Sequence, residues 1–188
     1  MHNKLKLEED IKKSLIKYST NFPEERNIVD RCFNFLSFGN GINNFSKKCF
    51  SDGHFTTSAL VLNLNKNKIL LTHHKFLNKW LQLGGHLEED QSFIGSAIRE
   101  SIEESGIKNI KPVINEILDI DIHEIPENVK KNEPKHFHYD IRYLLQSDIE
   151  DFIVSDESNA LEWMNFNDAK KYSEASMGRM INKIMSVL

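Results

Sequence analysis

A carboxylate-rich segment near the middle of the chain combines side chains that could hold a metal ion. Glu100, Glu103 and Glu104 lie at positions i, i+3 and i+4, so on a helix they share one face. Such a face repels itself unless a cation sits on it. Gly84 and Gly85 lie upstream, and glycines leave backbone carbonyls and amides open to close approach. Hard oxygen ligands beside bare backbone suit Mg²⁺ or Mn²⁺, and these ions in turn suit a phosphate-bearing substrate.

The same segment resembles the signature box of the Nudix hydrolases. The residues that match this box in type and spacing are Gly85, Arg99, Glu100, Glu103, Glu104, Gly106 and Ile107. Gln91 stands where the family usually has a glutamate, and Ser101 stands where it usually has an aliphatic residue. Three other segments, 54–59, 80–86 and 136–140, resemble one bacterial Nudix subgroup. The box is the most specific part of the resemblance.

The resemblance implies both a fold and an activity. The expected fold is α/β (α+β), a Nudix-like α/β/α sandwich with a mixed sheet. The expected enzyme uses water to cleave the diphosphate of a nucleoside diphosphate linked to another group, X. Mg²⁺ or Mn²⁺ is the expected cofactor, because a metal ion neutralises the diphosphate and lowers the pKa of a bound water. ADP-ribose, dinucleoside polyphosphates, nucleotide sugars and oxidised nucleotides all stay open as substrates, because the box specifies only the diphosphate.

Roles for the box residues follow from the resemblance, residue by residue. Glu100 and Glu104 are the expected metal ligands, and Glu103 binds the ion directly or through water. The carbonyl of Gly84 is a further candidate ligand. Arg99 is expected to hold the neighbouring carboxylates in place through charge-assisted hydrogen bonds. Without the box, the three glutamates would simply indicate a solvated helix face.

The general base is expected outside the box. Some Nudix enzymes take this base from a later loop, and Asp156 and Glu157 lie in such a loop here. We predict that Glu157 is the base, with a polar loop that caps the next strand as the alternative. Glu100 is the other candidate, although a carboxylate tied to a metal is a weak base.

Three further residues, His86, His138 and Tyr139, are predicted to bind substrate. His86 follows the glycine pair and either approaches a phosphate or packs within its loop. His136 and His138 alternate on a predicted strand and so share one face. Two histidines without a third ligand at a recognisable spacing argue against a zinc site. Tyr139 is one of several aromatic residues that could stack on a nucleobase.

Composition limits the class of protein. The chain of 188 residues is long enough for one domain, and we divide it into a helical extension (1–50) and a Nudix domain (51–188). The net charge of −4 argues against a dedicated nucleic-acid binder. Two cysteines and the absence of a long apolar run predict a cytoplasmic protein with no membrane span. The helical extension could form a lid or the arm of a homodimer.

Periodicity predicts the order of the elements. The predicted helices are 5–18, a second helix from Pro23 to the glycines at 39 and 41, 93–105 after an N-cap at Ser92, one from Ala169, and 177–187. The predicted strands are 55–64, 68–73, 113–122, 136–146 and 161–166. Ile94, Ile98 and Ile102 are expected to pack the box helix on the sheet, and Gly106 is expected to end this helix in a left-handed conformation.

Two other classes compete with the hydrolase. A non-catalytic Nudix-fold module that binds a ligand or a partner is favoured by Gln91 and Ser101, but such a module would not need a repulsive cluster of glutamates. A pyrophosphohydrolase acting on RNA 5′ ends is less compatible with the acidic balance of the chain.

Overall fold

The computed structural model describes residues 2–37, 44–88, 92–172 and 175–188. Its helices are α1 (His2–Asn21), α2 (Arg26–Ser37), α3 (Phe93–Ser105), α4 (Phe166–Tyr172) and α5 (Ala175–Val187). Its strands are β1 (His54–Leu62), β2 (Lys68–His74), β3 (Lys79–Leu81), β4 (Leu83–His86), β5 (Ile110–Pro112), β6 (Asp119–Ile125), β7 (His136–Ser147) and β8 (Ser158–Asn165). Short 3-10 turns cover Pro23–Glu25 and Val129–Lys131. None of the helices described is long and apolar enough to cross a lipid bilayer.

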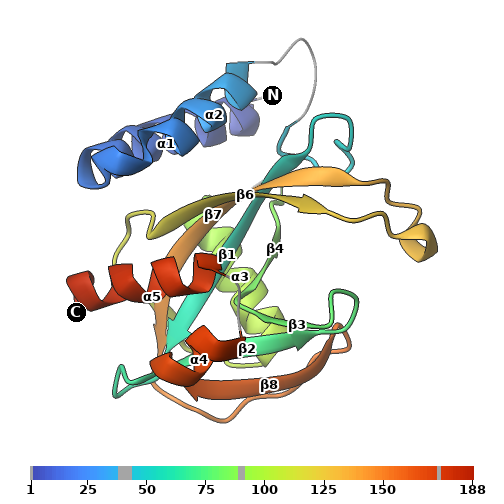
Figure 1. Cartoon of the computed structure of the whole chain (residues 1–188). Coiled ribbons are helices and arrows are strands. Elements are labelled where there is room, and N and C mark those ends of the chain that lie inside the picture. The colour runs from blue at the N-terminus through green and yellow to red at the C-terminus, as the bar shows by residue number, and fades with distance from the viewer. Residues whose placement is uncertain (1, 38–43, 89–91, 173–174) are drawn as a thin grey trace.

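The eight described strands form one mixed sheet around the pair β1 and β7 (Figure 1). These two strands run parallel, from His54 opposite His138 to Leu62 opposite Gln146. Strand β4 pairs antiparallel with the first half of β1, and β6 pairs antiparallel with β7. Three segments far apart in the sequence, at β4, β1 and β7, therefore lie side by side.

Helices cover both faces of the sheet, which confirms the predicted α/β/α arrangement and the presence of an N-terminal helical extension. Alternate residues of β1 face opposite layers. Phe55 and Ala59 belong to a buried cluster with side chains of α1, α2 and α3. Leu60 and Leu62 belong to a second buried cluster with side chains of α4 and α5. The division of the chain at residue 50 stays a prediction.

Several element boundaries differ from those predicted. The strand expected over 113–122 is replaced by β5, which ends at Pro112, and β6, which begins at Asp119. Both strands pair with the long strand β7. At the two ends of the segment between them, Val113 N donates to Leu144 O and Leu118 N donates to Arg142 O of β7. Strands β3 and β4 were not predicted, since they are short and β4 contains two glycines. The predicted helix end at Gly39 and Gly41 lies outside the described residues.

Helix α3 has the predicted ends but not the predicted packing face. The side chain of Ser92 accepts a hydrogen bond from Gly95 N, and Gly106 ends the helix at φ 70°. The expected isoleucine stripe is only partly buried, and the buried side consists of Phe93, Ser96, Ala97, Ser101, Glu104 and Ser105. Small side chains let the helix approach the sheet closely. Ser101 suits this position because its hydroxyl donates to the carbonyl of Ala97 (2.7 Å).

Candidate active site

The glycine pair of β4 brings the backbone of the sheet against the carboxylates of α3. Gly84 N donates to Glu104 Oε2 at 3.3 Å. A Cβ atom added to Gly85 would lie 2.5 Å from the Cδ atom of Glu100, which is closer than real Cβ contacts come. Glycine is therefore required at Gly85 for the carboxylate to occupy this place.

Arg99 links the same helix to the strand and to its neighbouring glutamates. Its Nη2 atom donates to Glu100 Oε1 and to the carbonyl of His86, both at 2.8 Å. Its Nη1 atom donates to Glu103 Oε2 at 2.9 Å. A two-pronged guanidinium can hold several acceptors in fixed directions. The side chain therefore holds Glu100 against β4, and its part in the reaction stays a prediction.

Burial and mutual repulsion destabilise the charged forms of these carboxylates. Burial raises the pKa of Glu104 to about 8; the charges of Glu100, Glu157 and Glu103 also raise it, against the hydrogen bond from Gly84. Burial likewise raises the pKa of Glu100, although Arg99 opposes the shift. An oxygen-rich cluster that is short of positive charge fits a hard divalent cation such as Mg²⁺ or Mn²⁺.

Glu157 lies on the loop before β8. Its side chain is 66% exposed, and Lys131 Nζ is 3.9 Å from its Oε1 atom. Its charge adds to the raised pKa of both Glu100 and Glu104, after the larger effect of burial. Gln91, where the family usually has a glutamate, lies outside the described residues.

Comparison with known proteins identifies the family. The NUDIX domain family matches residues 54–184, which is more than half of the chain. The chain belongs to this family. The resemblance carried by the box is thereby confirmed.

Similar proteins include named hydrolases. A relative from Lactococcus lactis subsp. cremoris (strain MG1363), named "Probable DHNTP pyrophosphohydrolase", is 37% identical over 95 residues. That match covers 50% of this chain and 55% of the relative, so it spans about half the length of each. This chain is thus similar over half its length to a protein named as a pyrophosphohydrolase.

Solved structures show the same fold. A NUDIX-family hydrolase from Clostridium perfringens is 27% identical with a TM-score of 0.50, and the match covers 71% of this chain and 95% of that one. An Ap4A hydrolase from C. elegans (18% identical, TM-score 0.56, 70% and 95% covered) and the E. coli dihydroneopterin triphosphate pyrophosphohydrolase (12%, 0.52, 70% and 95%) share the fold alone.

The three predicted substrate-binding residues of this Nudix protein do not lie together. His86 and His138 meet a third histidine, His54, and one ring nitrogen from each falls within 4.8 Å of the others. Tyr139 belongs to the opposite face of β7, and its ring stacks on Phe35 at a centroid distance of 3.9 Å.

The sequence did not indicate that His54 lies beside His86 and His138, because a lone histidine at the start of a strand carries no local signal. Only the parallel pairing of β1 with β7 places it opposite His138. The sequence offers no third ligand at a recognisable spacing to His136 and His138, whereas the fold brings His54 and His86 beside His138.

Proposed function

We propose that this chain is a divalent-metal-dependent hydrolase that cleaves the diphosphate linkage of a nucleoside diphosphate bonded to another group, X. The observation that carries the proposal is the buried carboxylate of Glu104 beside Glu100, against bare glycine backbone and with a single arginine nearby. Membership of the NUDIX family and the pyrophosphohydrolase name of the Lactococcus relative support it.

The proposed ligands of the cation are the carboxylates of Glu100, Glu103 and Glu104 and the carbonyl of Gly84. A divalent ion bound there would neutralise diphosphate charge and lower the pKa of a coordinated water. Arg99 is a positioning residue in this proposal, because its hydrogen bonds hold Glu100 and Glu103 in place without reaching the reacting atoms.

Glu157 is the proposed general base. Its carboxylate is exposed and held only loosely by Lys131, so it stays available to take a proton from the attacking water. The water oxygen then bonds to phosphorus, an anhydride P–O bond breaks, and the leaving phosphate carries away the electron pair. The carboxylates of α3, by contrast, are engaged by Arg99 and by Gly84 N.

Residues other than the α3 carboxylates would bind the group X. His86 on β4 and His138 on β7 lie close together and stay candidates for contacts with X, whereas Tyr139 already has one ring face covered by Phe35. A cytoplasmic location and a homodimer formed through α1 and α2 stay predictions; fractionation and sedimentation would test them.

A substrate panel tests the proposal directly. The panel includes ADP-ribose, nucleotide sugars, oxidised nucleoside triphosphates, Ap4A and dihydroneopterin triphosphate, each with Mg²⁺ or with Mn²⁺, and products are identified by mass. We expect metal-dependent release of a phosphorylated product from at least one substrate. We expect Glu104→Gln to abolish it, whereas Glu9→Gln, at an exposed position of α1, leaves it unchanged. Absence of turnover across the panel with both metals would favour the non-catalytic binding module.

A further inference from the structure

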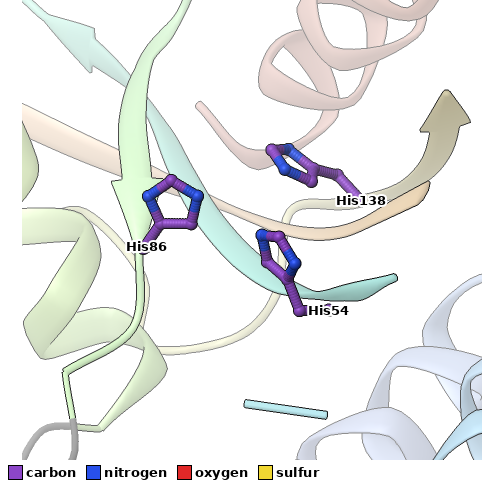
Figure 2. Close-up of side chains that lie close together, drawn as sticks. All are labelled: His54, His86 and His138. Atoms are coloured by element: carbon purple, nitrogen blue, oxygen red, sulfur yellow. The ribbon is translucent and has the colours of Figure 1, made fainter. Parts of the chain in front are cut away.

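Five of the eight histidines of the chain gather at one end of the sheet, on β1, β4, β6 and β7. They are His54, His86, His123, His136 and His138, and their ring centroids lie 4.7–5.7 Å from one another in the contacting pairs. The central three come from three adjacent strands, and their rings turn toward a common space (Figure 2).

Hydrogen bonds with backbone carbonyls determine which nitrogens of this cluster offer lone pairs. His54 Nδ1 lies 3.1 Å from the carbonyl of Cys49, which can only accept, so Nδ1 carries the hydrogen and Nε2 presents a lone pair. That Nε2 atom is buried and has no hydrogen-bond partner among the described residues. An unsatisfied buried nitrogen is costly, and here it faces two other imidazoles.

His136 supports the cluster from its edge. Its Nδ1 atom lies 2.6 Å from the carbonyl of Pro134, so Nδ1 donates and Nε2 carries a lone pair. That Nε2 lies 3.1 Å from Nε2 of His138. This separation is compatible with a hydrogen bond from His138 and also with two nitrogens that share one ion, since tetrahedral Zn–N bonds of roughly 2.0–2.1 Å place ligands roughly 3.3 Å apart.

We propose that His54, His86 and His138 form a binding site for a divalent transition-metal ion, with Zn²⁺ as the type ion. A ligand set of imidazoles without carboxylates suits Zn²⁺, Co²⁺ or Ni²⁺ rather than Mg²⁺. Three protein ligands leave a fourth position for His136, water or an oxygen of a bound anion. The ligand nitrogens, now within 4.8 Å, need only small side-chain rotations to close on an ion.

The electrostatics of the cluster favour a metal over an anion. Burial lowers the pKa of His54 to about 4 and lowers that of His138 as well, so both rings are neutral near pH 7 and keep their lone pairs. His54 is fully buried, whereas His86 and His138 are partly exposed, which gives an ion a route from solvent.

This histidine site is distinct from the carboxylate site of α3. The side of β4 that contacts Glu100 is the side of Gly85, and the next residue, His86, points to the opposite side. The two sites meet through the backbone, because the carbonyl of His86 accepts from Arg99. The inference does not rest on the proposed hydrolase activity, and its test needs no substrate.

Equilibrium dialysis of metal-stripped protein against Zn²⁺, with excess Mg²⁺ to compete at the carboxylates, tests the proposal. We expect one tightly bound equivalent. His86→Ala and His138→Ala should each raise its dissociation constant by more than about 100-fold, because loss of a direct ligand exceeds the cost of losing an outer partner. The control histidine is His73 on β2, whose ring contacts Trp80 rather than the cluster. His73→Ala and Glu104→Gln should both keep the equivalent.

Cobalt spectroscopy supplies a second readout that needs no variant. Co²⁺ bound by imidazoles in a tetrahedral site should give the wild-type protein visible d–d bands, and Zn²⁺ should displace them. Circular dichroism confirms that the variants are folded, and His138→Gln replaces His138→Ala if the latter is not. Absence of a Zn²⁺ equivalent, its survival in the folded His86 and His138 variants, or its loss in Glu104→Gln would each overturn the proposal.

Discussion

Two clusters of carboxylates lie in this molecule, and they differ in how their charge is balanced. The acidic site on α3 consists of Glu100, Glu103 and Glu104 with Arg99 as its cation. The ion-pair network joins β6, β7, α5 and the 3-10 turn before α2; its acids are Glu25, Asp119, Asp121 and Asp140, and its cations are Arg142, Arg179 and Lys183. The acidic site has one cation for three carboxylates, whereas the network has three cations for four.

The pKa directions follow this difference. Burial alone would raise the pKa of Asp121, but the hydrogen bond with His123 and the charge of Arg142 outweigh it, so the pKa lies below its usual range. Burial dominates at Glu104, whose pKa rises to about 8. The carboxylates of the network are therefore largely balanced within the folded chain, whereas those of the acidic site share one arginine. Charge matching thus separates carboxylates that hold the fold from those available for a ligand.

Removing the central cation of the network should give the largest effect. Arg142 is buried, and its guanidinium contacts Asp119, Asp121 and Asp140 at 2.8–3.4 Å. We expect Arg142→Ala to lower the free energy of unfolding by about 3–5 kcal/mol, because it leaves buried carboxylates unpaired.

Urea unfolding measures this change, and Lys171→Ala is the control. Lys171 pairs with Asp168 at the surface, where solvent screens the pair, so we expect its removal to change stability little. If both variants lost the same free energy of unfolding, the buried ion-pair network would not stabilise the fold more than a surface ion pair does.

The pH dependence of stability should separate the clusters by sign. Without divalent ions, folded Glu104 keeps its proton up to about pH 8, whereas in the unfolded chain it ionises near 4.5. The contribution of the protonated Glu104 side chain to the free energy of unfolding is therefore at its maximum below about pH 4.5. It decreases as the pH rises and is lost by about pH 8. Asp121 has the opposite sign, since its stabilising contribution is lost as the pH falls below its ordinary pKa of 3.8.

The quantity to measure is the difference in the free energy of unfolding between wild type and Glu104→Gln. The contributions of the other titrating groups are the same in both proteins and cancel. Between pH 5 and pH 8 we expect the wild type to lose about 2–4 kcal/mol relative to the variant. Urea unfolding in a chelator at stepped pH gives this difference, and Glu9→Gln is the control. A difference that stays constant with pH would mean that Glu104 is not held protonated by burial.

Divalent ions should stabilise the acidic site but not the network. An ion that binds only the folded state adds about 2.7 kcal/mol at a concentration 100 times its dissociation constant. We therefore expect Mg²⁺ to raise the melting temperature of wild type and not that of Glu104→Gln. An equal rise in both proteins, measured at constant ionic strength, would place the binding elsewhere.

The acidic site was predictable because its signals are local. The spacing of Glu100, Glu103 and Glu104, the cap at Ser92 and the stop at Gly106 all lie within one helix and its ends. Short-range rules of capping and periodicity apply there. Ile94, Ile98 and Ile102 were predicted to form the packing face of α3, but periodicity does not indicate how closely a helix approaches its sheet. The small residues Ala97 and Ser101 lie on the buried side instead.

The network and the histidine cluster were not predictable because they depend on pairing between distant strands. Thr56 and Ser58 donate to Asp140 only because β1 runs parallel to β7 in one register. A shift of that register by one residue would turn His54 and His138 to opposite faces. No local feature of the sequence determines this register, so these contacts could not be predicted from the sequence.

Replacing arginine by lysine should give the smallest effect and test how each cluster uses its cation. Arg99→Lys keeps the charge but loses the fork that reaches Glu100, Glu103 and the carbonyl of His86. Arg179→Lys makes the same change in the network, where Arg179 contacts Asp119 at 2.8 Å.

The two lysine variants should differ in which property changes. For Arg179→Lys we expect a loss of about 1 kcal/mol in the free energy of unfolding with kcat unchanged. For Arg99→Lys we expect about a tenfold loss of kcat/KM and a change of less than about 1 kcal/mol in stability, because the acidic site contributes geometry rather than stability. Full activity in Arg99→Lys would show that charge alone serves there. A large loss of stability in that variant would place Arg99 with the network, because its hydrogen bond to β4 would then be holding α3 on the sheet.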